Sequence, residues 1–212
     1  MDGLIKTIQQ RLEEGLPGKQ AHHRMIPESR HLFPNEVENP IPAAVLILLY
    51  PNREDRLETI LIKRPSYNGH HSAQVSFPGG KAEKTDQNLY GTALRESMEE
   101  VGINPDLIEF IGALSPLYIP VSRFVVHPFI AFAMHTPEFL IDKSEVDYLI
   151  PASIKDLLKP EVHYRNLIIQ SKEFSTPYFN VKNEMVWGAT AMILSELIEV
   201  LKSTPAIDRF LD

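Results

Sequence analysis

The sequence predicts a single mixed α/β domain preceded by a helical segment, and three observations support this fold class. Two apolar runs, 43–49 and 59–63, have the length of buried strands and are separated by a polar turn. Two later segments, 88–102 and 188–202, repeat their apolar residues at helical spacing. With 212 residues, 43% of them hydrophobic, the chain can bury one substantial core.

The remaining elements follow in order along the chain. Apolar residues over 4–12 predict an amphipathic first helix, and a proline-bearing connection follows it. We therefore expect an N-terminal helix and connection over 1–39 and the main domain over 40–212. The other expected elements are strands at 108–114, 125–132, 163–169 and 178–181 and a short helix at 154–158.

The helix at 88–102 combines an apolar stripe with three acids. The stripe comprises Tyr90, Leu94, Met98 and Val101. At about 100° per residue, this stripe places Glu96, Glu99 and Glu100 together on the opposite face. Like charges at such spacings destabilise a helix by a few tenths of a kcal/mol each, so their convergence indicates either a compensating cation or a solvated surface. Asn88 is the expected N-cap, and Gly102 is the expected helix stop.

The segment before this helix favours the cation. Val75 and Phe77 end an apolar alternating stretch, and Gly79 and Gly80 form a turn that allows positive φ and close approach of the backbone to a ligand. A strand, a glycine turn, a loop and an acidic helix therefore follow one another. Hard cations such as Mg²⁺ prefer the carboxylate and carbonyl oxygens that this arrangement offers.

These segments resemble the signature box of the Nudix hydrolases. The matching residues are Gly80, Arg95, Glu96, Glu99, Glu100, Gly102 and Ile103. The chain departs from the box in three ways: Asp86 stands where Glu is expected, eight residues instead of seven precede Arg95, and Ser97 occupies an aliphatic position.

The resemblance implies an α/β/α sandwich with a mixed β-sheet and metal-dependent hydrolysis of a nucleoside diphosphate derivative. The implied ligands of Mg²⁺ or Mn²⁺ are Glu96, Glu99, Glu100 and the carbonyl of Gly80. Arg95 is expected to orient a carboxylate, although an ordinary surface salt bridge is the alternative. A further acid from a later loop, either a general base or another ligand, is expected to be Glu145, with Asp142 and Asp147 as competitors.

The stretch from Ile60 to Gly80 is similar to the additional motif of the coenzyme A pyrophosphatase branch of this family. Arg64, Val75 and 77–80 agree with that motif, whereas the residues that differ from it are Ile62, Pro65, Gly69 and Ala73. The segments 118–122 and 186–190 also resemble that branch. The implied reaction splits coenzyme A or an acyl thioester into 3′,5′-ADP and a 4′-phosphopantetheine product. Alternatives are ADP-ribose, NADH or a dinucleoside polyphosphate as substrate, or a Nudix-shaped module that binds a nucleotide without cleaving it.

Several residues near the box are candidate substrate ligands. Arg64 presents a planar donor fork suited to phosphate, with a strand-end surface pair as the alternative. His71 could line the cleft, and Lys81 is either near phosphate or an exposed turn lysine. Tyr118 and Trp187 could stack on a base, although large aromatic residues more often belong to the core. Adjacent histidines such as His22-His23 and His70-His71 do not have the spacing of a zinc site.

Composition excludes several other classes. The net charge of −7 argues against broad nucleic-acid binding, and the absence of cysteine excludes disulfides and thiolate chemistry. No apolar run approaches the length that spans a bilayer. We expect a cytoplasmic enzyme that acts on a small-molecule nucleotide, with no nucleic-acid or membrane partner, and leave a homodimer open.

Overall fold

The structure is a computed structural model that describes residues 2–33, 39–66, 73–169, 171–204 and 207–210. Its centre is an eight-stranded mixed sheet, with the order β3-β2-β1-β7-β5 and three shorter attachments: β4 on β1, β6 on β7 and β8 on β2. The strands are β1 (Ile41–Pro51), β2 (Leu57–Lys63), β3 (Val75–Ser76), β4 (Gly79–Lys81), β5 (Ile108–Ala113), β6 (Leu117–Ile119), β7 (Phe124–Ala133) and β8 (Tyr148–Ser153).

The pairing of β1 with β7 makes the sheet mixed, because these two long strands run parallel from Ile41 opposite Phe124 to Leu49 opposite Phe132. The other strand pairs are antiparallel. Strand β1 is buried on both faces, which explains its nearly continuous apolar sequence.

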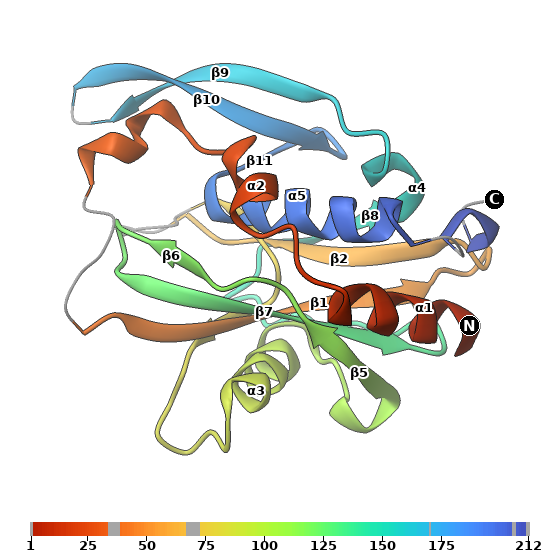
Figure 1. Ribbon diagram of the computed structural model, residues 1–212. Coiled ribbons are helices and arrows are strands. Elements are labelled where there is room, and N and C mark those ends of the chain that lie inside the picture. Colours follow the sequence, from red (N-terminus) through yellow and green to blue (C-terminus); the bar gives the residue numbers. More distant parts are fainter. Residues whose placement is uncertain (1, 34–38, 67–72, 170, 205–206, 211–212) are drawn as a thin grey trace.

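Helices cover both faces of this sheet (Figure 1). Helix α3 (Leu89–Val101) lies on one face, and the long α5 (Gly188–Lys202) lies on the other together with α1 (Asp2–Glu13) and α2 (Lys19–His23). A second antiparallel sheet of β9 (Val162–Ile169), β10 (Lys172–Val181) and β11 (Glu184–Trp187) packs against α5. The short helices are α4 (Ile154–Leu157), η1 (Glu28–Leu32), η2 (Pro105–Leu107) and η3 (Ile207–Phe210). The expected α/β/α sandwich with an N-terminal helix is confirmed.

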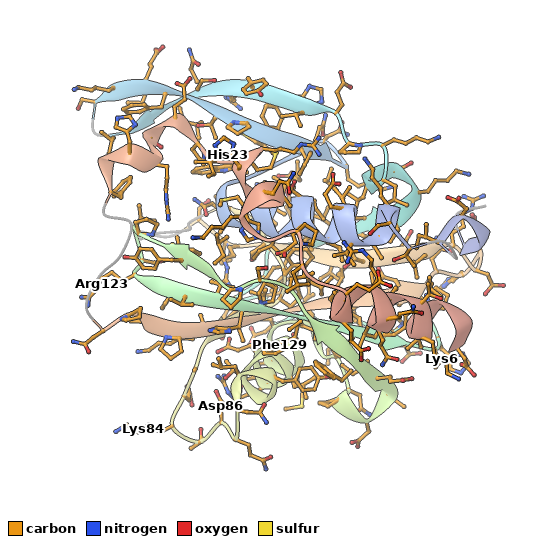
Figure 2. All side chains as sticks on the ribbon, in the orientation of Figure 1. Lys6, His23, Lys84, Asp86, Arg123 and Phe129 are labelled. Atoms are coloured by element: carbon orange, nitrogen blue, oxygen red, sulfur yellow. The ribbon has the colours of Figure 1, made fainter. Side chains whose placement is uncertain are left out.

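Alternate residues of β1 supply two separate cores, since successive side chains of a strand point to opposite faces. Ala44, Leu46 and Leu48 pack toward α3, whereas Ile47 and Leu49 join the larger core beneath α5. Side chains fill both spaces in Figure 2, where Phe129 lies between the sheet and α3. Its ring centroid is 5.5 Å from that of Tyr90 on α3.

The N-terminal segment is bound into the larger core. Leu4, Ile5 and Ile8 of α1 and Met25 after α2 are buried there. Polar contacts join the same segment to α5, because the fully buried carboxylate of Glu196 accepts hydrogen bonds from three parts of the chain. Its donors are the Gly18 N–H at 2.9 Å, His22 Nε2 at 2.9 Å, the Ser115 hydroxyl at 2.7 Å and the Ser115 N–H at 3.2 Å.

Candidate metal and diphosphate site

A glycine corner forms the base of the site. Strand β4 pairs with β1 so closely that a Cβ on Gly79 would lie 2.3 Å from the Ala44 carbonyl oxygen. Gly79 also has φ of +148°, a conformation that side chains rarely adopt. A Cβ on Gly80 would lie 2.3 Å from Oε2 of Glu96. Only glycine fits at position 79, whereas a side chain at position 80 would displace the Glu96 carboxylate, against which the backbone of Gly80 directly lies.

Caps hold α3 in register over this corner. The Asn88 side chain accepts a hydrogen bond from the Gly91 N–H at 2.9 Å. At the other end, Gly102 is left-handed, with φ of +72°, and its N–H reaches the Met98 carbonyl at 3.0 Å. Both expected helix boundaries are confirmed.

The predicted faces of α3 need a correction. Met98, assigned to the apolar stripe, is 51% exposed, whereas Glu100, assigned to the acidic face, is completely buried. The helix packs on the sheet through smaller side chains, Ala93 and Ser97, together with Val101. This orientation of α3 on the sheet directs Glu100 into the glycine corner and leaves Met98 in solvent.

Glu100 is held by the corner and by Arg64. One carboxylate oxygen accepts the Gly79 N–H at 2.8 Å, and the other accepts Arg64 Nη2 at 3.1 Å. The same guanidinium nitrogen donates to the Gly79 carbonyl at 2.9 Å. Burial raises the pKa of Glu100 to about 7, opposed by Arg64 and the Gly79 N–H and reinforced by the neighbouring acids Glu96 and Glu145. A cation beside this carboxyl would favour its ionised form.

Three acids converge above the corner. Ligand oxygens of Glu96, Glu100 and Glu145 all lie within 4.8 Å of one another. Burial, as the largest cause, also raises the pKa of Glu96. Glu145 comes from the loop before β8, where its competitor Asp142 instead accepts hydrogen bonds from Ser144. The structure thus brings together one loop acid and two helix acids.

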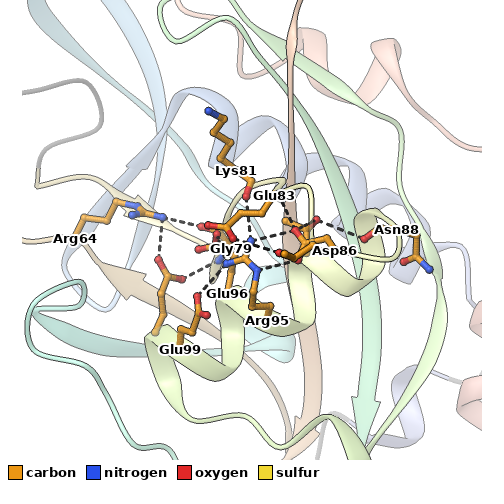
Figure 3. Close-up of polar contacts among 12 residues, drawn as sticks. Arg64, Gly79, Lys81, Glu83, Asp86, Asn88, Arg95, Glu96 and Glu99 are labelled. Carbon is orange, nitrogen blue, oxygen red and sulfur yellow. Dashed lines mark hydrogen bonds and ion pairs between the residues drawn. The ribbon is translucent and has the colours of Figure 1, made fainter.

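Arg95 organises the other side of the acidic helix with five hydrogen bonds (Figure 3). Its guanidinium donates to Glu96 at 2.9 Å and to Glu99 at 3.0 Å. It also donates to the Lys81 carbonyl at 3.1 Å and twice to Asp86, at 2.9 and 3.2 Å. These contacts exceed those of an ordinary surface pair. The half-exposed Glu99 faces Arg95 and is not among the three clustered acids.

Asp86, which stands where the box expects the longer Glu, still contacts Arg95. Asp86 accepts hydrogen bonds from Arg95, from the Glu83 N–H at 2.9 Å and from the Thr92 hydroxyl at 2.8 Å. The Arg95 hydrogen bond is the main reason that the pKa of Asp86 lies well below its ordinary value. The loop with its extra residue thus delivers the shorter side chain to Arg95.

A pocket of about 970 Å³ opens beside the corner. Arg64, Gly80 and Lys81 line it, as do the aromatic residues Tyr118 and Trp187, for which a place in the core was the alternative. The candidate His71 lies outside the described residues.

Sequence reasoning missed the part of the pocket wall that comes from the N-terminal segment, namely Pro27, Ser29, Arg30 and Phe33. These residues follow no periodic pattern and match no motif. Only the tertiary fold brings them to the pocket.

Comparison with known proteins agrees with this geometry. The NUDIX domain profile matches residues 40–166. Nudix hydrolase 15, mitochondrial, of Arabidopsis thaliana is 33% identical over 177 residues, which cover 78% of this chain; the match spans only 60% of the length of that plant relative. An uncharacterized Nudix hydrolase NudL of Pectobacterium atrosepticum is 32% identical over 164 residues, covering 77% of this chain and 84% of the relative.

A solved structure supports the same fold. The crystal structure of a Nudix hydrolase from M. Smegmatis, RenU, has a TM-score of 0.55 at 15% identity and covers 78% of this chain and 88% of that chain. An α/β/α sandwich with acids clustered beside a glycine corner defines the structural class. The chain belongs to the Nudix hydrolase family, whose enzymes act on phosphoanhydride bonds. None of the described helices is long and apolar enough to cross a membrane.

Proposed function

We propose that the chain is a metal-dependent pyrophosphohydrolase that cleaves coenzyme A or its acyl thioesters into 3′,5′-ADP and 4′-phosphopantetheine or its acyl derivative. The observation that supports hydrolysis most strongly is the convergence of Glu96, Glu100 and Glu145, of which Glu96 lies against Gly80 and Glu100 accepts a hydrogen bond from the Gly79 N–H.

The donor set suits a hard cation. Carboxylate oxygens of Glu96 and Glu100, which Glu145 approaches from its loop, and the carbonyl of Gly80 are the ligand type that Mg²⁺ and Mn²⁺ prefer. Glu99 is proposed as a further ligand, since Arg95 holds it beside Glu96. When bound, such an ion neutralises phosphate charge and lowers the pKa of a coordinated water.

The protein's own residues have separate roles in this proposal. Arg64 and Lys81 bind the substrate diphosphate, because both line the pocket next to the glycine corner. Arg95 acts as a positioning residue that fixes the carboxylates of Glu96 and Glu99. Glu145, on a loop and exposed, is the candidate general base.

Two observations favour coenzyme A over other nucleotides. The stretch of β2 to β4 that contains Arg64 is similar to the coenzyme A pyrophosphatase motif. The pocket is also large and mostly apolar, with aliphatic side chains such as Val126 and Ile193 in its wall. A long pantetheine arm can pack against such a wall, whereas ADP-ribose has no such arm. The cytoplasmic location and a homodimer remain predictions from the sequence.

Substrate profiling tests the proposal. The purified protein is incubated with Mg²⁺ or Mn²⁺ and with coenzyme A, acetyl-coenzyme A, ADP-ribose, NADH or diadenosine polyphosphates, and the products are separated by liquid chromatography. We expect the highest kcat/KM with coenzyme A or its thioester and the release of 3′,5′-ADP. Preference for ADP-ribose would overturn the substrate assignment. Binding without cleavage of any compound would indicate a nucleotide-binding module instead.

A further inference from the structure

Arg30 is a partly buried cation in the pocket wall, and it has no acidic partner among the residues that the structure describes. It belongs to η1, which lies on the α5 side of the sheet, whereas the acidic helix α3 lies on the opposite side (Figure 1). Its Nη1 donates to the Tyr118 carbonyl at 3.2 Å, and its Cζ lies 5.8 Å from the centroid of the Tyr118 ring. Within the described ranges, no carboxylate pairs with it. Burying such a charge is costly unless a counter-charge meets it.

Two hydroxyl groups of the same wall also lack partners: one belongs to Tyr118, which Arg30 contacts, and the other to Ser122, four residues further along the chain. The Tyr118 Oη and the Ser122 Oγ are both buried, and neither has a hydrogen-bond partner among the residues that the structure describes. Both residues line the same pocket as Arg30. Leaving a buried polar atom without a partner is costly, so a ligand oxygen that accepted a hydrogen bond from either hydroxyl would offset that cost.

The donors of this wall suit a phosphate. Arg30 has four N–H groups beyond the one that contacts the Tyr118 carbonyl, and each hydroxyl can donate once more. Such a set, a planar guanidinium fork with neutral donors, matches the oxygens of a phosphate monoester. It comes from η1 and the β6 region, whereas the glycine corner and Arg64 belong to β4 and the end of β2. One pocket therefore contains two groups of side chains whose donors suit phosphate, and the two groups lie on different elements.

We propose that Arg30, Tyr118 and Ser122 form a second anion subsite, which binds a phosphate monoester of the substrate apart from the diphosphate that is cleaved. If the proposed function holds, on which this identification rests, the bound group is the 3′-phosphate of coenzyme A. The N-terminal segment then determines specificity, because ADP-ribose and NADH lack that phosphate.

The experiment compares two substrates in two proteins. Steady-state kcat/KM is measured with coenzyme A and with 3′-dephospho-coenzyme A for the wild type and Arg30→Met, a change that retains an apolar stem and removes the charge. We expect the wild type to prefer coenzyme A by roughly 10- to 100-fold, the range of a charge-assisted hydrogen bond. Arg30→Met should lose that preference because its KM for coenzyme A rises, while its kcat/KM for 3′-dephospho-coenzyme A changes by less than about twofold.

Two further variants distinguish the loss of this subsite from a general loss of folding or activity. Tyr118→Phe keeps the ring under Arg30 and removes only the unsatisfied hydroxyl, so it should lower kcat/KM selectively for coenzyme A. Arg24→Met is the matched control, because Arg24 belongs to the same segment but pairs with Glu199 in solvent. We expect Arg24→Met to leave kcat/KM unchanged for both substrates.

The outcomes distinguish this subsite from the proposed function. If Arg30→Met lowers kcat/KM equally for both substrates, the subsite is overturned and the hydrolase assignment stays intact. If the wild type cleaves neither compound, the proposed function fails. The subsite is then tested by calorimetry, which compares the affinity of the protein for 3′,5′-ADP with its affinity for AMP. Tighter binding of 3′,5′-ADP that Arg30→Met abolishes supports it, and equal binding of the two nucleotides overturns it.

Discussion

Glu100 combines complete burial with a charge that the proposed chemistry requires. The Gly79 N–H and Arg64 supply its hydrogen bonds, yet burial still holds its pKa at about 7. A protein selected for stability alone would place an apolar side chain here, since buried ion pairs are often no better than apolar packing. The retention of a carboxylate at this position is consistent with a ligand that compensates its charge.

Replacing Glu100 by Gln tests its role directly. We expect kcat to fall at least about 100-fold, because metal-ion stabilisation of the transition state is worth several kcal/mol. The rise in Tm on adding Mn²⁺ should disappear as well. Glu109→Gln on exposed β5 removes the same charge and should change neither quantity. An unchanged kcat in Glu100→Gln would remove this residue from the site.

Asp86 should make stability depend on pH in a defined direction. Its pKa is lowered mainly by the Arg95 hydrogen bond, so its contribution is complete above the unfolded-state value of about 4 and is lost as pH falls through the lower folded value. Asp86→Asn should therefore reduce the free energy of unfolding most at neutral pH. The gap between wild type and variant, measured by urea unfolding, should narrow from about pH 5 toward pH 2. A constant gap would contradict the assignment.

At the scale of elements, glycines define the C-terminal end of the acidic helix and the corner beneath it. Gly102 ends α3 in a left-handed conformation, and a Cβ there would lie 2.8 Å from the Cβ of Leu140. Gly91, in contrast, lies within α3, and a Cβ there would meet only the Asn88 side chain, at 3.7 Å. The two glycines of one helix thus have opposite structural roles.

Alanine substitution at these two glycines should change stability in opposite directions. Gly102→Ala is expected to cost about 1 kcal/mol or more, because it adds strain at positive φ and crowds Leu140. Gly91→Ala is expected to stabilise by up to about 1 kcal/mol through helix propensity. Chemical denaturation measures both. Equal effects of the two changes would contradict the predicted role of the cap.

Local signals predicted some elements and missed others for identifiable reasons. Caps and spacing predicted the bounds of α3, and apolar periodicity predicted α5 at 188–202, as observed. Strand β8 was missed because Pro151 interrupts its pattern, and such a proline is tolerated where the strand pairs on one side with β2 alone. The three-residue β6 is too short to give a periodic signal.

The site was predictable only where its geometry is local. The box residues and the glycine corner lie close together in sequence, and the resemblance indicated Arg95 and the acids. The burial of Glu100 was not predictable, because it depends on how α3 rotates against the sheet. Arg30 reaches the pocket only through the tertiary fold, and no local sequence signal marks it.

At the scale of the whole molecule, Glu196 connects the N-terminal segment to the main domain. Burial alone would raise the pKa of Glu196, but hydrogen bonds from His22, Ser115 and Gly18 hold it below its ordinary value. The carboxylate thereby fixes α2 against α5, and η1, which follows α2 in the chain, brings Arg30 to the pocket wall. The position of Arg30, and with it the proposed specificity of the pocket, therefore depends on this contact.

Removing the Glu196 carboxylate should strongly reduce the stability of the protein. Glu196→Ala leaves a cavity and unpaired N–H groups of Gly18 and Ser115, so we expect a loss of about 3 kcal/mol or more in the free energy of unfolding. Glu199→Ala, on the same helix, removes only a solvent-exposed pair with Arg24 and should cost less than about 1 kcal/mol. Similar losses in urea unfolding of the two variants would contradict the proposed connection.

The central claim is that Glu96 and Glu100 bind a divalent cation beside the Gly80 carbonyl, with Glu145 next to them as the candidate general base. The most direct measurement is an anomalous difference map from a crystal soaked in Mn²⁺. We predict a peak bonded to the carboxylates of Glu96 and Glu100 and to the Gly80 carbonyl oxygen. A fully soaked crystal with no peak there, or with these carboxylates turned away from the ion, would contradict the claim.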